Sequence, residues 1–129
     1  MTQAVLVDTH ILIWVRAAQH RLAGWERQVL DSARLRYVSS ATLWEIAILM
    51  TLGRVAEDER LLDLPGGFDL LPIRPEHCKA LTTLPRLHRD PFDRMLIAQA
   101  RVENLPLLTR DRRIIAYGAD GARIMSPAG

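Results

Sequence analysis

The sequence has 129 residues, of which 49% are hydrophobic, enough apolar material for a single domain spanning residues 1–129 with its own core. Its one cysteine excludes an internal disulfide or a cysteine-rich zinc site, and no apolar run approaches the roughly 20 residues of a membrane-spanning helix. The formal net charge of +2 permits nucleic-acid binding without indicating it, and because no secretory signal pattern is visible, we expect a cytoplasmic protein.

Short apolar strands alternate with amphipathic helices along the chain. In chain order, the pattern predicts a strand at 4–7, helices around 11–15 and 25–30, a strand at 36–38, a helix between Ser39 and Gly53, a short helix and loop within 57–67, a strand at 68–73, helices at 75–83 and 90–103, a strand at 105–109, a helix around 114–117 and a strand at 123–125. This order predicts an α/β fold, a three-layer α/β/α sandwich with a mainly parallel central sheet.

Four acids are expected to meet at the carboxyl edge of this sheet, where such folds bind ligands. Asp8 follows the first predicted strand, and Asp111 follows the fourth. Glu45 lies in the first turns of the helix after the second strand, and Asp93 lies in the first turn of the helix that leads into the fourth strand. Because that helix runs antiparallel to the strand after it, its first turn faces the same edge.

Four carboxylates at one place repel each other unless a cation neutralises them, so their convergence predicts a metal. Oxygen ligands without thiolates favour Mg²⁺, for which Mn²⁺ can substitute, over zinc. Such an ion generates a hydroxide from bound water and stabilises a leaving oxygen, which is the chemistry of phosphodiester cleavage. The hydroxyl of Thr9 is placed to orient that water.

The same acids also have purely structural explanations. Asp8 and Asp111 are each placed to cap the helix that follows. Glu45 stands three residues after Thr42, which is the spacing of a capping box. Asp90 is explained first as the N-cap of its helix, so its role as a further metal ligand stays open.

Four segments together resemble a PIN-domain endoribonuclease of the VapC toxin type. They are VLVDTHILIW, SSATLWEIAI, HRDPFDRMLIAQA and LPLLTRD, they occur in the order of that family, and they span nearly the whole chain. The resemblance implies an RNA-cleaving toxin, dependent on Mg²⁺ or Mn²⁺, that acts on tRNA or rRNA. It assigns catalysis and metal binding to four acids, of which the first two are the surest ligands: Asp8, Asp93, Glu45 and Asp111.

The resemblance also implies partners. Proteins of this type are neutralised by a cognate VapB-like antitoxin that lies along the N-terminal helices, and many are homodimers. Trp14, Trp25 and Trp44, with Ile48 and Leu49, lie on the helices that would form the antitoxin groove. For Trp44, burial in the core is the favoured explanation, and for Trp14 and Trp25 the two explanations are balanced.

Several arginines stand close in sequence to two of the acids and are the candidates for RNA phosphate contacts: Arg94, Arg110, Arg112 and Arg113. Solvation of the surface is the simpler explanation for most arginines. His88 and Cys78 are assigned no function.

Three alternatives remain at the level of sequence. A haloacid-dehalogenase-like phosphatase needs an aspartate two residues after Asp8, where this chain has His10. A DNA-directed nuclease of the flap-endonuclease type needs inserts that a chain of this length does not contain. A PIN-like module that only binds protein would be marked by loss of the acids, and none is lost.

Overall fold

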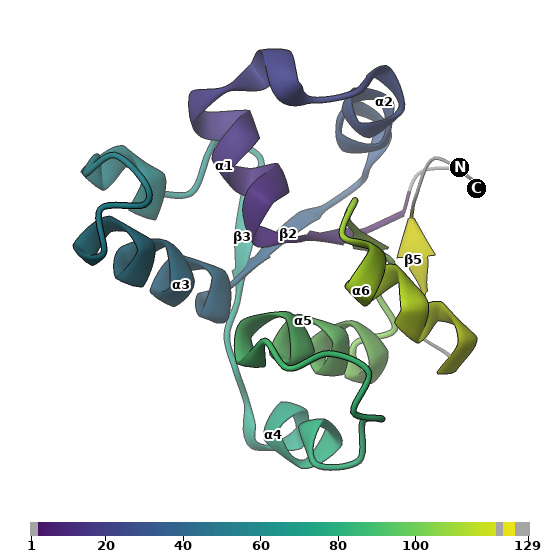
Figure 1. The fold of residues 1–129 in the computed structure, drawn as a ribbon. Helices are drawn as coiled ribbons and strands as arrows, with labels where there is room; N and C mark the ends of the chain where they lie inside the picture. Colours follow the sequence, from purple (N-terminus) through teal and green to yellow (C-terminus); the bar gives the residue numbers. More distant parts are fainter. Residues whose placement is uncertain (1–2, 121–122, 126–129) are drawn as a thin grey trace.

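A five-stranded parallel sheet runs through the centre of the protein, in the order β3-β2-β1-β4-β5 (Figure 1). The computed structural model describes residues 3–120 and 123–125. The strands are β1 (Val5–Val7), β2 (Arg36–Ser39), β3 (Phe68–Leu71), β4 (Leu107–Leu108) and β5 (Ile124–Met125). The predicted parallel α/β fold is therefore confirmed. β3 ends two residues earlier than predicted because Pro72 has no N–H to donate to the sheet.

Helices cover both faces of the sheet. In Figure 1, α1 and α2 lie on one side of it and α4 and α5 on the other. The helices are α1 (Thr9–Ala17), α2 (Gly24–Ser32), α3 (Ser40–Thr51), α4 (Pro75–Leu81), α5 (Pro91–Val102) and α6 (Arg112–Ile115), with 3-10 turns η1 (Gln19–Arg21), η2 (Glu59–Leu62) and η3 (Ala116–Asp120). Within the described part of the chain, no helix has the length and apolar character needed to cross a bilayer.

The core has two layers, one on each face of the sheet. Along β1, Val5 and Val7 belong to the layer under α1, α2 and α3, whereas Leu6 belongs to the layer under α5 and α6. Successive side chains of a strand point to opposite faces, so both faces of β1 are buried. This explains why the first strand is a continuous apolar run in the sequence rather than an alternating one.

Capping side chains mark the starts of four helices. Asp8 caps α1, Ser39 caps α3, Asp90 caps α5 and Asp111 caps α6, each by accepting a backbone N–H of the first turn. α1 directly follows β1, and α6 follows β4 after a short loop. The acids at these junctions are thereby held at the carboxyl edge of the sheet.

Candidate active site

Asp8 is the most deeply buried acid at the carboxyl edge, with 4% of its surface exposed. Its Oδ1 accepts the backbone N–H of Ile11 at 2.9 Å, and its Oδ2 accepts the hydroxyl of Thr109. Burial raises the pKa of Asp8, and the charge of Asp111 raises it further, against the lowering effect of these two hydrogen bonds. The side chain is therefore fixed in position by contacts from α1 and from the end of β4.

Glu45 reaches the same edge from α3. Its Oε1 accepts the hydroxyl of Thr9 at 2.6 Å, and the Thr9 and Thr42 hydroxyl oxygens are 3.2 Å apart. Burial raises the pKa of Glu45, and the charges of Asp90 and Asp8 add to the effect, against the Thr9 hydrogen bond. The capping-box explanation of Glu45 is wrong, because α3 begins at Ser40 and Thr42 already lies inside the helix. Water orientation by Thr9 stays a prediction.

Asp93 lies at the third position of α5 and is paired with a residue to which the sequence assigned no function. His88 Nε2 is 2.7 Å from Asp93 Oδ2, and both residues are buried. Burial raises the pKa of Asp93 to about 6, and the charges of Asp90 and Glu45 also raise it, while the contact with His88 lowers it. The sequence signal that points to His88 is its position five residues before Asp93, shortly before the same helix begins.

Asp111 completes the group. Ligand-type atoms of His88, Asp93 and Asp111 all lie within 4.8 Å of one another. The backbone N–H of Asp111 donates to the Thr109 hydroxyl at 3.0 Å, which places it beside the carboxylate that Thr109 contacts. Burial favours a raised pKa for Asp111, but the N–H and guanidinium of Arg113 outweigh it and lower the pKa.

The four predicted acids and Asp90 form one group. The pKa values of Asp8, Glu45 and Asp93 are each raised by the charge of another member, and an Asp111 oxygen lies within 4.8 Å of an Asp93 oxygen. A hollow of about 220 Å³ opens over Asp8 and Asp111 and is also lined by His10, Trp14 and Arg110. Asp8, whose pKa is raised, and Asp111 offer carboxylate oxygens to this hollow, and carboxylate oxygens are the donors that a hard divalent cation prefers. Metal binding by Asp8, Asp93, Glu45 and Asp111 stays a prediction, and these are the residues that would hold the ion.

Comparison with known protein families identifies the fold that carries these acids at its carboxyl edge. The model of the PIN domain matches residues 5–120. The chain belongs to the PIN-domain family. The matched segment runs from the first strand to beyond α6, so it includes all four acids.

The individual proteins that resemble this PIN domain share low sequence identity with it. Ribonuclease VapC22 of Mycobacterium tuberculosis (strain ATCC 25618 / H37Rv) is 27% identical over 124 residues, which cover 88% of this chain and 91% of the relative. A toxin-antitoxin complex from Klebsiella pneumoniae contains a chain with a TM-score of 0.63 and 21% identity, with 95% of this chain and 97% of that chain covered. VapBC2 from Rickettsia felis, bound to a DNA fragment from its promoter, gives a TM-score of 0.70 and 16% identity, with coverage of 95% and 97%. These two structures support the fold.

Two of the arginines predicted to contact RNA are bound within the PIN domain itself. Nη1 of Arg94 donates to the Pro85 carbonyl at 2.9 Å and to the Tyr117 hydroxyl at 3.0 Å. Arg110 makes a bidentate ion pair with the fully buried Glu26 and stacks over the Trp14 ring, with 4.3 Å from Cζ to the ring centroid. The guanidinium groups of Arg94 and Arg110 are therefore occupied by contacts within the domain.

The ion pair predicts a structural role for Arg110 that can be measured. We expect Arg110→Ala to lower the free energy of unfolding by about 1–3 kcal/mol, because it leaves the buried Glu26 carboxylate without its partner. The loss stays below that of a fully buried pair because the Arg110 side chain is 40% exposed and water can replace part of it. Urea denaturation of Arg110→Ala and of the double variant Arg110→Ala/Glu26→Gln measures it. An unchanged single variant would contradict this role.

The tryptophans differ from one another in burial. Trp44, predicted to be a core residue, is 62% exposed and packs edge-on against Phe92, with ring centroids 5.2 Å apart. That prediction was wrong because α3 is apolar on nearly all sides, so the sequence marks no solvent face. Trp14 and Trp25 are half-buried and pack against the core layer under α1.

Proposed function

We propose that this PIN domain is an endoribonuclease toxin that hydrolyses phosphodiester bonds of cellular tRNA or rRNA with Mg²⁺ or Mn²⁺. The observation that carries the proposal is the group of acids at the carboxyl edge, three of which have raised pKa values. Such a group is destabilised by its own charge unless a cation is bound. The similarity to a protein named Ribonuclease VapC22 supports RNA as the substrate.

The side chains divide the work of the proposed reaction. A bound divalent ion would supply the activation of water at neutral pH and the stabilisation of charge on the leaving oxygen. Asp8 would hold the ion with a carboxylate that the Ile11 N–H and the Thr109 hydroxyl already orient, so little ordering would be needed on binding. Glu45 is oriented in the same way by Thr9. Asp93 would bind as a carboxylate, and a cation beside it would lower its raised pKa.

Exposed basic side chains lie beside this centre, where they can bind the phosphate backbone of the substrate. A hollow of about 530 Å³ beside His88 is lined by the exposed Arg86 and Arg89. Arg112 and Arg113 are exposed next to Asp111. Guanidinium groups bind phosphate oxygens well, so these four arginines are the proposed RNA contacts.

The contacts predict a specific salt dependence. We expect Arg86→Ala/Arg89→Ala to weaken RNA binding and to reduce the slope of log affinity against log salt by about 2, because each lost phosphate contact removes about 1. Arg54→Ala/Arg101→Ala removes the same charge from exposed positions, one shortly after α3 ends and one in the last turn of α5, and serves as the matched control. Fluorescence anisotropy with a labelled RNA measures both slopes. Equal slopes for the two double variants would contradict the proposed path.

Activity itself is tested with purified protein free of any antitoxin. We expect cleavage of total cellular RNA with Mg²⁺ or Mn²⁺, no cleavage after chelation, and recurrent 5′ ends that map to tRNA or rRNA. Single-stranded and double-stranded DNA are the comparison substrates. Faster cleavage of DNA than of RNA would contradict this proposal and favour a DNA-directed nuclease. If neither were cleaved, the alternative of a PIN-like module that only binds protein would be favoured.

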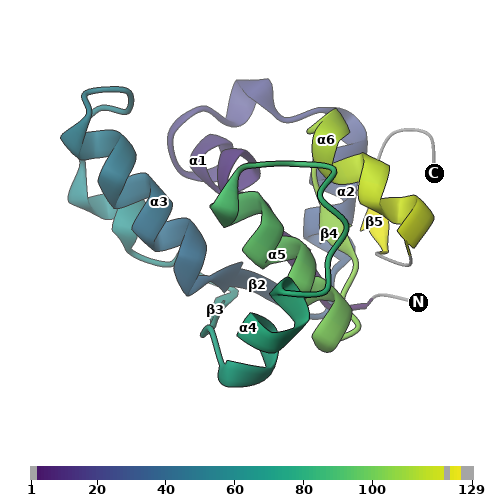
Figure 2. The same cartoon turned by 60° about the horizontal axis from the view of Figure 1, so that its bottom comes forward.

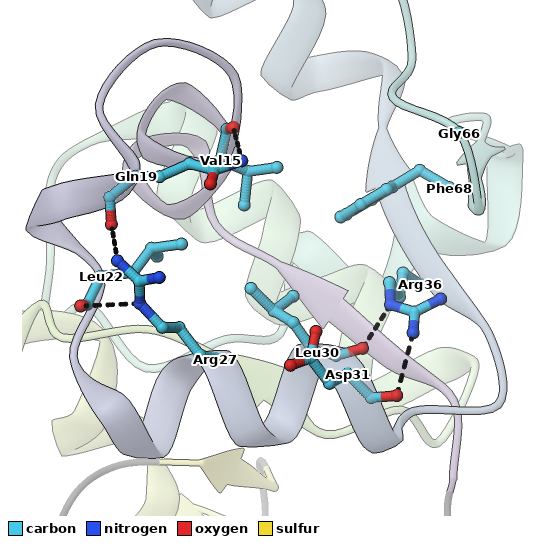
Figure 3. A pocket seen from close by; sticks show the side chains of 9 residues that line it. All are labelled: Val15, Gln19, Leu22, Arg27, Leu30, Asp31, Arg36, Gly66 and Phe68. Carbon is cyan, nitrogen blue, oxygen red and sulfur yellow. Dashed lines mark hydrogen bonds between the residues drawn. The ribbon is translucent and has the colours of Figure 1, made fainter.

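An antitoxin partner is part of the proposal, and α1 is the proposed contact. Figure 3 shows Val15, Leu30 and Phe68 around a hollow between α1, α2 and the start of β3, with a volume of about 370 Å³. The guanidinium groups of Arg27 and Arg36, on its rim, are engaged with backbone carbonyls. These contacts keep the rim in place, and the half-buried Val15 and Phe68 are the apolar side chains that a partner can contact.

The same helix also borders the acidic centre. Ile11 and Trp14 of α1 line the hollow over Asp8, whereas Val15 lines the hollow of Figure 3. α1 has nine residues and is about 14 Å long, so a peptide segment that follows it reaches from one hollow to the other. We propose that an antitoxin segment binds in this way and blocks the acids. Homodimerisation remains an expectation from the family.

Val15→Arg tests the antitoxin contact. The probe is the antitoxin that co-purifies with this protein, and the control is Ala17→Arg, an exposed position on α1. We expect Val15→Arg to lose affinity about 10-fold or more, because a long charged side chain at this position fills the hollow and adds a third cation beside Arg27 and Arg36, while RNA cleavage by the free protein is retained. Equal affinity for the two variants would contradict binding along α1.

A further inference from the structure

His88 is a buried imidazole at the acidic centre that the proposed reaction does not use. Its side chain is 3% exposed, and its Nε2 is 2.7 Å from Asp93 Oδ2. Its Nδ1 is 3.5 Å from the backbone nitrogen of Asp90, a group that only donates. The tautomer that satisfies both contacts carries the proton on Nε2, accepts at Nδ1 and donates to Asp93.

We propose that His88 is a positioning residue that holds Asp93 through the Nε2–H and leaves the second carboxylate oxygen for the divalent ion. The inference rests on the proposed metal-dependent function. A ring nitrogen that carries this proton has no lone pair for a cation, so His88 is not itself a ligand, although it lies within 4.8 Å of Asp93 and Asp111 oxygens. Hydrogen bonds to ligating carboxylates fix their orientation and strengthen metal binding.

The segment that carries His88 is itself held in place. In Figure 2, the chain between α4 and α5 runs back past α5 to reach the start of that helix. The backbone N–H of His88 donates to the Tyr117 hydroxyl at 3.2 Å, and that hydroxyl donates to the Pro85 carbonyl at 2.7 Å. Arg94 donates to the same hydroxyl and the same carbonyl. The imidazole is thus oriented before any ion binds.

A second histidine provides a control of the same chemistry. His77 Nε2 is 2.7 Å from Glu103 Oε2, and His77 Nδ1 accepts the backbone N–H of Arg74 at 3.0 Å. His77 is fully buried, like His88, but Glu103 is the C-cap of α5, at the opposite end of the helix from Asp93. Loss of either histidine removes a buried hydrogen bond, whereas only loss of His88 changes a carboxylate of the acidic centre.

The experiment compares His88→Leu with His77→Leu in the full chain, with Mn²⁺ alone as the probe. Electron paramagnetic resonance of free Mn²⁺ gives the affinity without reference to catalysis, and thermal unfolding in EDTA gives the stability. We expect His88→Leu to weaken Mn²⁺ binding by about 10- to 100-fold and His77→Leu to change it by less than about 2-fold, at comparable losses of stability. Equal affinities for the two variants would overturn the inference.

Polar replacements separate positioning from ligation and keep the test decisive if His88→Leu does not fold. His88→Gln places an N–H donor near the position of Nε2 and is expected to restore Mn²⁺ affinity to within a few-fold. His88→Asn has a shorter amide that does not reach Asp93, and we expect it to bind as weakly as the leucine variant. If Gln and Asn are equally weak, the inference is wrong. If the wild-type protein itself does not bind Mn²⁺, the proposed function fails as well.

Discussion

Asp93→Asn and Asp8→Asn are each expected to lower the rate of RNA cleavage by more than about 100-fold. Loss of a group that only orients a ligand already costs about 10- to 100-fold, and these substitutions remove the ligand charge itself. Both variants should fold, because an amide oxygen still accepts the hydrogen bond from His88 or from Ile11. Single-turnover cleavage of a labelled RNA, with circular dichroism of each variant, measures both effects.

The control for this pair is Asp63→Asn, which removes one carboxylate charge from an exposed position after η2. It should leave the cleavage rate unchanged. If either active-site variant kept wild-type activity, the acidic centre would not be the catalytic site.

The second large effect concerns stability without and with a divalent ion. In EDTA, we expect the free energy of unfolding to fall as the pH rises from about 4 to 6. The pKa of Asp93 is about 6 in the folded protein and has an ordinary value of 3.8, so in this range the folded state binds more protons than the unfolded chain. Deprotonation therefore costs the folded state more, and stability drops as the pH rises through this window.

A bound cation should reverse the trend above pH 6, because it stabilises the ionised carboxylates of the folded state alone. At an Mn²⁺ concentration of 100 times Kd, the expected gain is about 2.7 kcal/mol. Urea denaturation at several pH values, with and without Mn²⁺, gives both curves, and Asp93→Asn shows how much of the slope belongs to this residue. A wild-type slope equal to that of Asp93→Asn would contradict the raised pKa of Asp93, and the absence of stabilisation by Mn²⁺ would contradict a metal site at these acids.

The parts of the site that the sequence predicted are those with a local signal. Asp8 and Asp111 follow strands, and Asp93 stands in a helix whose start is marked by Asp90 and Pro91. A strand in a parallel sheet fixes where its carboxyl end lies, so position in the chain translates into position at the edge. Asp8, Asp90 and Asp111 also cap helices, so the structural explanation of these acids is confirmed, and their catalytic role stays a prediction.

The parts that the sequence did not predict depend on distant contacts. His88 reaches Asp93 because its segment is bound by Tyr117, which lies 29 residues further along the chain. Arg94 is adjacent to Asp93, but successive residues of a helix point about 100° apart, and its guanidinium turns to the Pro85 carbonyl instead of to the substrate side. No local pattern encodes the path of such a segment.

The proposed metal centre is tested most directly by locating the ion in a crystal of the wild-type protein soaked with Mn²⁺. Anomalous scattering identifies manganese independently of any assumption about the ligands. We expect one or two peaks at the carboxyl edge, within about 2.0–2.3 Å of oxygens of Asp8 and Asp93, with His88 contacting Asp93 and not the ion. Peaks elsewhere only, or none at full Mn²⁺ saturation, would contradict the claim that these acids form a metal centre.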